Sequence, residues 1–154
     1  MAKLSKVSEL ATLYGDVADF ATIYIMEAHP ADGWRLEGND TMMEGVEQSR
    51  NFEQHKSLAD RLEAAAHLLT HRAMVAAERD GDCEESRQSM PLFVDSMGDD
   101  ANLAYGSLFE RLYVIKDGKV AVQGGKGPSN YFVSDVSDWL MQEVGDRGFS
   151  ADGL

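Results

Sequence analysis

The chain opens with apolar residues three to four positions apart, the spacing of one face of a helix. Leu4, Val7, Ala11 and Tyr14 follow this spacing and predict an amphipathic helix over residues 3–14. The glycine that comes next is expected to end the helix, because glycine readily adopts the backbone conformation of a helix C-cap.

Two later segments show the same helical spacing. Ser57 is a suitable N-cap for a helix that extends to about Met74, and Ser134 or Asp135 opens a final helix. The apolar stripes of these two helices consist of Leu58, Leu62, Ala65, Ala66 and Leu69, and of Val136, Trp139, Leu140 and Val144.

Four segments have the composition of β-strands. The second half of residues 17–25 and all of residues 90–95 are nearly continuous apolar runs, which predicts strands buried within a sheet. Residues 109–116 and 119–123 are separated by Asp117-Gly118, a strong signal for a two-residue hairpin turn. The last two strands are therefore expected to be antiparallel neighbours.

The predicted order is helix, strand, helix, strand, hairpin and helix, which indicates an α/β domain. One strand placed before the first helix would complete a thioredoxin-like fold, so we expect a thioredoxin-like fold that lacks its first inner β-strand. This domain covers residues 1–145, and the polar residues 146–154 are expected to form a flexible tail. A missing inner strand exposes apolar helix faces and unpaired backbone groups, so we expect marginal stability and aggregation.

Composition narrows the classes of function. The chain has 154 residues, of which 27 are acidic and 14 are Lys or Arg, so its formal net charge is −13. This charge disfavours binding to nucleic acid or to anionic membrane surfaces. The single cysteine, Cys83, excludes an internal disulfide and a four-cysteine zinc site, and its acidic neighbours oppose thiolate formation. No run approaches the roughly 18 apolar residues of a membrane-spanning helix.

The first predicted strand leads into a segment dense in reactive side chains. Glu27 and His29 are two positions apart, so on an extended backbone they share a face and the carboxylate can orient the imidazole. Trp34 adds an aromatic wall, and ligand sites of open α/β sheets collect beyond the carboxyl ends of strands. The residues alone also allow a structural interpretation, in which a solvated histidine and a packed tryptophan flank a turn at residues 32–33.

Two other groups suggest chemistry less strongly. Residues 124–128 (GGKGP) lack the spacing of a phosphate-binding loop, which leaves Lys126 as a point charge able to bind a carboxylate. Glu63, His67 and His71 are spaced four apart on one helix face, but no HExxH motif is present and they are more typical of surface residues than of metal ligands. We therefore expect no metal site.

The stretch Ile23–Trp34, IYIMEAHPADGW, resembles a motif of the iodothyronine deiodinases. Similar blocks follow in the order of that family: QHKSLADR at 54–61, FERLYVI at 109–115 and VQGGKGP at 122–128. Members of the family are selenoenzymes with a thioredoxin-like fold that remove iodine reductively from thyroid hormones. The likeness extends over about residues 1–141.

The resemblance implies a substrate clamp. His29 matches the histidine that holds the phenolic end of the iodothyronine, and Lys126 matches the cation that binds its amino-acid carboxylate; Trp34 lies in the same motif. The family usually has arginine at the position of Lys126, so the bidentate fork of a guanidinium is lost there.

The resemblance also implies catalytic residues. Glu27, His55 and Glu110 match positions that orient the substrate or transfer protons. Leu108 stands where an aromatic residue is common, and it cannot relay a proton. The selenocysteine of the family lies just before the first helix, so we expect this chain to be truncated just after that position and inactive as written. A selenocysteine codon read as a stop, with a restart at Met1, would explain this.

The implied function is thiol-dependent deiodination of thyroxine-like iodinated phenols, with an external thiol reductant and no cofactor. The resemblance further implies a possible homodimer and a membrane anchor outside this chain. Two alternatives stay open: a non-catalytic thioredoxin-like module that binds iodinated aromatics, and a thiol peroxidase-like relative. A selenocysteine or cysteine before the first helix would favour an enzyme.

Overall fold

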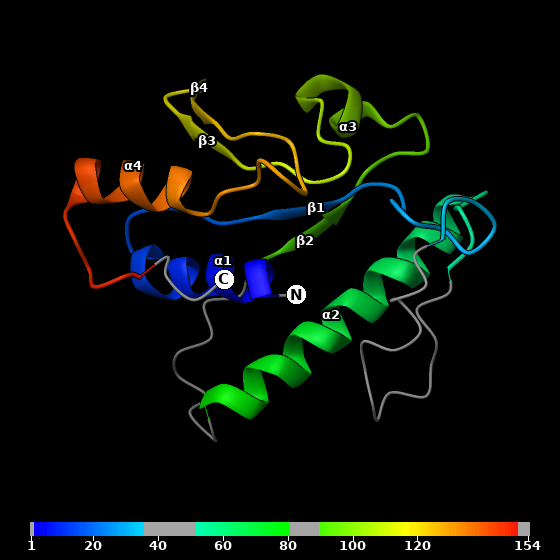
Figure 1. The fold of residues 1–154 in the computed structure, drawn as a ribbon, viewed down its shortest axis with the longest axis horizontal. Helices are drawn as coiled ribbons and strands as arrows, with labels where there is room; N and C mark the ends of the chain where they lie inside the picture. The colour runs from blue at the N-terminus through cyan, green and yellow to red at the C-terminus, as the bar shows by residue number, and fades with distance from the viewer. Residues whose placement is uncertain (1, 36–51, 81–89, 151–154) are drawn as a thin grey trace.

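The computed structural model describes residues 2–35, 52–80 and 90–150 (Figure 1). Its elements follow in the order helix, strand, helix, strand, helix, hairpin and helix. The short helix before the hairpin is the one element that the sequence does not predict. The helices are α1 Ala2–Tyr14, α2 Leu58–Asp80, α3 Asp100–Tyr105 and α4 Ser134–Val144, and the strands are β1 Thr22–Tyr24, β2 Leu92–Val94, β3 Tyr113–Lys116 and β4 Lys119–Gln123.

The four strands form two separate pairs. β1 and β2 are parallel, with Ile23 opposite Phe93, and β3 and β4 are antiparallel. No ladder joins the two pairs within the described residues. Helices combined with small sheets belong to the α/β class and are consistent with a thioredoxin-like fold.

The first two strands differ from the prediction. β1 occupies only three residues of the segment 17–25, and β2 only three of the segment 90–95. The central side chains Ile23 and Phe93 are 46% and 56% exposed, so neither strand is buried on both faces. The physical reason is that Ile23 and Phe93 lie opposite each other and project from the same face of the strand pair, which the described residues leave largely uncovered.

The turn and the second strand of the hairpin agree with the prediction, whereas β3 covers only Tyr113–Lys116 of the predicted residues 109–116. Asp117 and Gly118 both have positive φ angles, of 53° and 72°, which is the backbone of a type I′ turn. The turn matches the right-handed twist of the two strands, and β4 covers the predicted residues 119–123.

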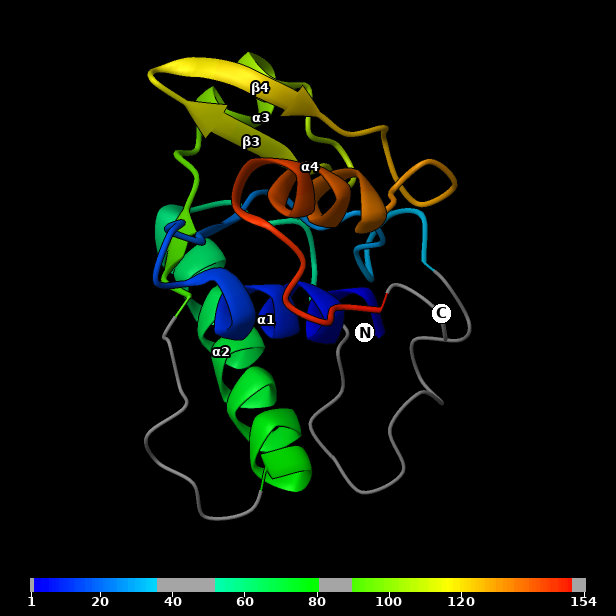
Figure 2. The same cartoon turned by 90° about the vertical axis from the view of Figure 1, so that its left-hand side faces the viewer.

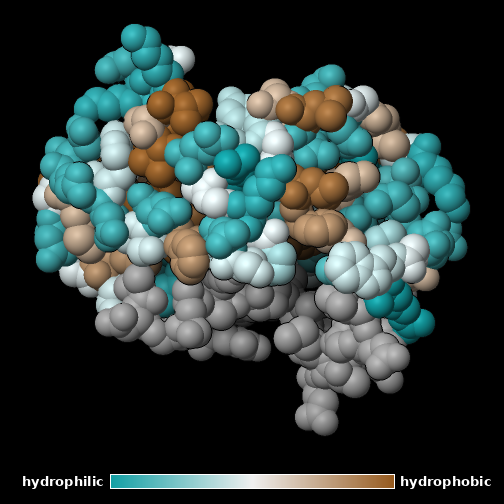
Figure 3. Space-filling view, turned by 45° about the horizontal axis from the view of Figure 1, so that its top comes forward, coloured by the Kyte–Doolittle hydropathy of each residue, from teal (hydrophilic) through white to brown (hydrophobic). Residues whose placement is uncertain are grey.

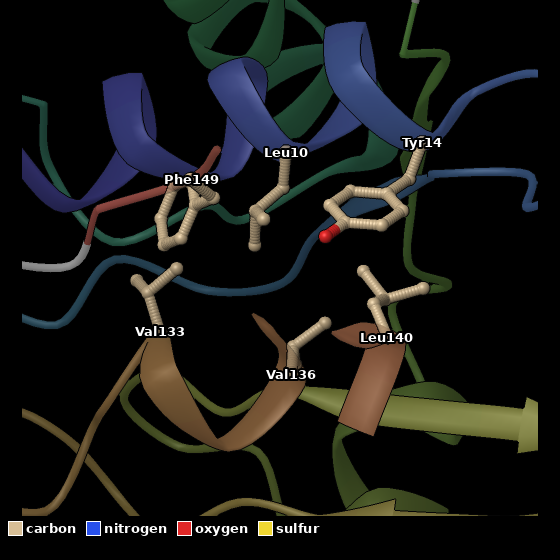
Figure 4. Packing of buried hydrophobic residues seen from close by; sticks show 6 residues of the cluster. All are labelled: Leu10, Tyr14, Val133, Val136, Leu140 and Phe149. Atoms are coloured by element: carbon tan, nitrogen blue, oxygen red, sulfur yellow. The ribbon is translucent and has the colours of Figure 1, made fainter. Parts of the chain in front are cut away.

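The hydrophobic core lies between α1 and α4 (Figures 1 and 4). Leu10 and Tyr14 of α1 face Val136 and Leu140 of α4, and all four side chains are buried. Figure 4 shows these side chains meeting in one layer together with Val133 and Phe149.

The segment after α4 contacts α1, which differs from the fraying that the sequence predicts. Phe149 is 7% exposed and joins the core cluster. Arg147 donates a hydrogen bond to the carbonyl of Leu13 at 2.9 Å and forms an ion pair with Asp16. An aromatic ring and a cation that both find partners on α1 hold the chain in place as far as Ser150. The domain division at residue 145 stays a prediction.

Helix α2 begins where its sequence predicts and ends later. The Ser57 hydroxyl accepts from the Asp60 amide at 3.2 Å, and the Asp60 carboxylate accepts from the Ser57 amide at 2.9 Å, so the two residues cap the helix reciprocally. The buried face is formed by Arg61, Ala64 and Ala65. The predicted stripe is wrong for four of its five residues, because Leu58, Leu62, Ala66 and Leu69 are exposed.

Figure 2 shows α4 above α1, with the hairpin beyond α4 and α2 running away at an angle. On the face turned forward in Figure 3, apolar side chains form separate patches between polar ones. None of the described helices is long and apolar enough to cross a membrane.

Candidate functional site

The segment after β1 brings three aromatic rings together. The His29 ring packs edge-on against Trp34 at a centroid distance of 4.8 Å and stacks on Phe109 at 5.8 Å with an interplanar angle of 16°. Trp34 and Phe109 are also in contact, at 6.3 Å. Trp34 is 66% exposed, so the cluster presents an open aromatic surface rather than a closed core.

One hydrogen bond determines which ring nitrogen of His29 can accept a hydrogen bond from a ligand. Nδ1 lies 3.0 Å from the carbonyl oxygen of Trp34. A carbonyl can only accept, so we assign the proton to Nδ1, and Nε2 of the neutral ring is then an acceptor.

Glu27 is held by residues from two segments, one at its carboxylate and one at its backbone. The hydroxyl of Tyr24 donates to it. The side chain of Gln54 pairs with the Glu27 backbone, donating to its carbonyl at 3.0 Å and accepting from its amide at 3.3 Å. Burial raises the pKa of Tyr24, and the hydrogen bond to Glu27 raises it further, so the phenol keeps its proton at neutral pH.

His55 lies behind this pair and is 8% exposed. Its ring is 5.6 Å from that of Tyr24, and neither ring nitrogen has a hydrogen-bond partner among the described residues. Burial lowers the pKa of His55; the Glu27 carboxylate opposes this shift and the Arg61 guanidinium adds to it. A buried neutral imidazole with unused nitrogens is typical of a group that exchanges protons.

Glu110 lies against the glycine-rich turn. The Gly127 amide donates to the Glu110 carbonyl at 2.9 Å, and a methyl group on Gly127 would lie 2.1 Å from Cγ of Glu110. Only glycine therefore lets the Glu110 side chain cross the turn at this point. Burial, together with the negative charge of Glu110, raises the pKa of nearby Tyr131 to about 12.

Lys126 is exposed on the same turn. Its Nζ lies 3.8 Å from the position that a Cβ atom would occupy on Gly106, the residue after α3. The amides of Gly124 and Gly127 donate to Leu112 and Glu110, so these two amides of the turn do not point into a phosphate cradle.

The structure groups the predicted site residues into neighbouring clusters. His29 and Trp34 meet at Phe109, and Glu27 approaches His55 through Tyr24. Sequence reasoning missed Tyr24, Gln54 and Phe109 as parts of the site. The available signal was their place in the segments that resemble the family: Tyr24 lies in residues 23–34, Gln54 in 54–61 and Phe109 in 109–115. No hydrogen bond or ring contact joins His29 to Lys126 in the described residues.

The structure gives no support for a functional role of the other residues considered, the possible metal ligands on α2 and Cys83. Glu63 and His67 are exposed, and the His67 ring packs on Phe52 at 5.2 Å. The residues that the structure describes contain no group of three possible metal ligands. The side chain of His71 and all of Cys83 lie outside the described residues.

A family model for iodothyronine deiodinase matches residues 1–144 of this chain. The chain belongs to the iodothyronine deiodinase family. Among its relatives are proteins named thyroxine 5-deiodinase from Sparus aurata (36% identity over 142 residues), Gallus gallus (39% over 142 residues) and Bos taurus (36% over 140 residues). These alignments cover 92%, 92% and 91% of this chain and 44%, 46% and 38% of the relatives. This deiodinase-family chain therefore spans less than half the length of these relatives.

Proposed function

We propose that this chain forms the substrate-binding part of a thiol-dependent deiodinase, which removes iodine reductively from thyroxine or a similar iodinated phenol. The convergence of distant segments carries the proposal: His29 stacks on Phe109, and the next residue, Glu110, packs against Gly127 beside Lys126. The relatives' name, thyroxine 5-deiodinase, supports the same substrate.

The aromatic cluster suits an iodinated phenol. Iodinated rings are large and apolar, and the exposed Trp34 ring, which meets the partly buried Phe109 ring edge-on, offers an apolar surface for them. In the proposed complex, Nε2 of neutral His29 accepts the phenolic proton, and protonated His29 donates to the phenolate. Either pairing holds the phenolic oxygen at the same nitrogen.

In the proposed reaction, a selenolate or thiolate attacks iodine. The C–I bond breaks, its electron pair stays on the ring carbon, and a proton takes the place of iodine there. The bond formed between the nucleophile and iodine is then reduced by external thiols, which releases iodide and leaves a disulfide. As in the family, we assign the nucleophile to a segment that precedes α1.

We assign proton handling to Glu27, His55 and Glu110. The Tyr24 hydroxyl donates to Glu27 and the Tyr24 ring contacts His55, so Tyr24, Glu27 and His55 lie close together. His55 is neutral at neutral pH because burial lowers its pKa, which leaves it able to accept a proton. Glu110 follows Phe109 in the chain and lies against Gly127.

We also propose that the strand preceding α1 pairs with β1. The Thr22 amide donates to Pro91 at 2.9 Å and the Asp95 amide donates to Tyr24 at 2.8 Å, so Thr22 and Tyr24 face β2. The backbone groups of Ile23 then face the opposite edge. Figure 1 shows the β3–β4 hairpin beyond that edge, so one added strand would unite the two sheets in a thioredoxin-like arrangement.

The test is iodide release from thyroxine with a dithiol in excess. It compares these 154 residues with a longer polypeptide in which the preceding coding sequence, including selenocysteine, is restored. We expect release from the longer polypeptide alone, with a lower kcat/KM after Lys126→Ala. Lys119→Ala, which removes a cation from the β3–β4 turn, is the matched control and should have little effect.

The other outcomes are informative as well. Thyroxine binding without iodide release by the longer polypeptide would favour the non-catalytic binding module. Neither binding nor release would contradict the proposed function.

A further inference from the structure

We propose that Arg111 is a second residue that binds the carboxylate of the substrate, together with Lys126. This inference rests on the proposed function and concerns the amino-acid end of the substrate. It assigns a positioning role to a residue of the FERLYVI block that the clamp of His29 and Lys126 does not include.

Arg111 and Lys126 point to the same small space. A Cβ atom built on Gly106 would lie 3.5 Å from Nη1 of Arg111 and 3.8 Å from Nζ of Lys126. Gly106 has a left-handed backbone, with φ of 57°, and it carries no side chain to fill that space. Two cationic nitrogens therefore lie within 4 Å of one point beside Gly106.

Neither cation has an ion-pair partner in the part of the chain that the structure describes. Lys6, Lys56, Arg61, Lys116 and Arg147 all form ion pairs with carboxylates. Arg111 and Lys126 form none with the carboxylates that the structure describes, although the chain has 27 acidic residues. Two adjacent like charges repel each other, and a bound carboxylate would remove that repulsion.

The Arg111 guanidinium is already held in position. Its Nε donates to the Gly124 carbonyl at 2.7 Å, and its plane lies 5.4 Å from the Tyr113 ring centroid. With the Gln123 amide oxygen turned towards it, Nη2 donates there at 2.9 Å. All these partners are uncharged, so the guanidinium keeps its full charge while losing little freedom on binding a ligand.

The location relative to the aromatic cluster fits a single ligand. Arg111 lies two residues after Phe109. The segment that contains both is hydrogen-bonded to the glycine-rich turn, because the Gly124 amide donates to the Leu112 carbonyl and the Gly127 amide donates to the Glu110 carbonyl. The segment that carries Arg111 therefore runs alongside the turn that carries Lys126. A molecule with its phenolic end at His29 can thus pass over Phe109 and place its carboxylate between Arg111 and Lys126.

Calorimetric titration of the 154-residue chain tests this proposal with two ligands. These are thyroxine and the corresponding tetraiodothyronamine, which has the same rings and amino group but no carboxylate. We expect Arg111→Gln to weaken thyroxine binding about tenfold or more and to leave thyronamine binding unchanged. Arg111→Lys, which keeps the charge without the fork, should give an intermediate value.

Lys119→Gln is the matched control, because it makes the same change in net charge on the same hairpin. Unchanged thyroxine binding by Arg111→Gln would overturn the proposal. An equal loss of affinity for both ligands would also overturn it, because it would mean that Arg111 stabilises the hairpin and does not bind the carboxylate. Failure of the unsubstituted chain to bind either ligand would contradict the proposed function itself and this inference with it.

Discussion

Nδ1 of His29 lies 3.0 Å from the carbonyl oxygen of Trp34, five residues later in the same loop. The loop therefore fixes both the orientation and the tautomer of the histidine before any ligand arrives. In the proposed complex, Nε2 is then the nitrogen that meets the phenolic oxygen, so the contribution of that nitrogen can be measured separately from that of the ring.

We predict that His29→Phe weakens thyroxine binding about tenfold. The substitution keeps a ring that can stack on Phe109 and removes the acceptor for the phenolic proton. The measurement is calorimetric titration with thyroxine and with its methyl ether at the phenolic oxygen, which has no proton to donate. The ether should bind the two proteins equally; a tenfold loss for both ligands would mean that His29 acts through packing alone.

We predict that Gly127→Ala destabilises the chain by about 1–3 kcal/mol, because the new methyl group overlaps the Glu110 side chain. The free energy of unfolding in urea measures this. Adding Glu110→Ala should restore most of the loss, since it removes the atoms that the methyl group meets. Gly98→Ala is the control, because a Cβ there would have no neighbour closer than 3.4 Å. Equal effects of the two alanines would contradict the overlap.

Stability should fall as the pH drops below about 6.5, in part because of His55. Burial lowers the pKa of His55 in the folded chain, so the unfolded chain binds more protons between that lowered pKa and about 6.5. The free energy of unfolding thus increases with pH across this window, by at most about 1.4 kcal/mol per pH unit for one proton.

Urea unfolding between pH 5 and 8 measures this effect. His55→Phe should remove the His55 contribution and so flatten the profile near pH 6, whereas His67→Gln at an exposed position should leave it in place. A profile that His55→Phe leaves as steep as before would show that the imidazole is solvated in the folded chain.

Phe149→Ala should lower the free energy of unfolding by about 3 kcal/mol, because the ring is almost fully buried in the layer between α1 and α4. Phe132→Ala, at a side chain that is 53% exposed, should cost much less. The urea midpoints of the two variants provide the comparison. If both variants unfold at the midpoint of the unsubstituted chain, the segment after α4 does not contribute to the core.

The sequence predicts best those features that depend on neighbouring residues. The hairpin forms at Asp117-Gly118 because this dipeptide supplies the required backbone angles, and α2 begins at the cap that Ser57 provides. Helix α3 was missed because its support is not local. The Asp95 carboxylate accepts from the amides of Ala101 and Asn102, six and seven positions further along the chain, at 2.9 Å each.

The candidate site shows the same division. The family resemblance indicates His29 and Lys126, but no pattern in the sequence places Tyr24 on Glu27 or Arg111 beside Lys126. Those neighbours depend on how β1 and the hairpin lie relative to each other, which tertiary packing determines. The burial of Phe149 was missed for a similar reason, since a single aromatic residue in a polar tail carries no periodic signal.

The break between the two strand pairs affects how the site responds to its ligand. His29 follows β1, whereas Lys126 follows β4, and no ladder of backbone hydrogen bonds connects these strands in the described residues. Within this part of the chain, the separation of the two ends of the clamp is therefore set by side-chain contacts such as that of His29 with Phe109. In the proposed clamp, a change of side-chain volume at position 109 is therefore expected to change the separation of His29 and Lys126.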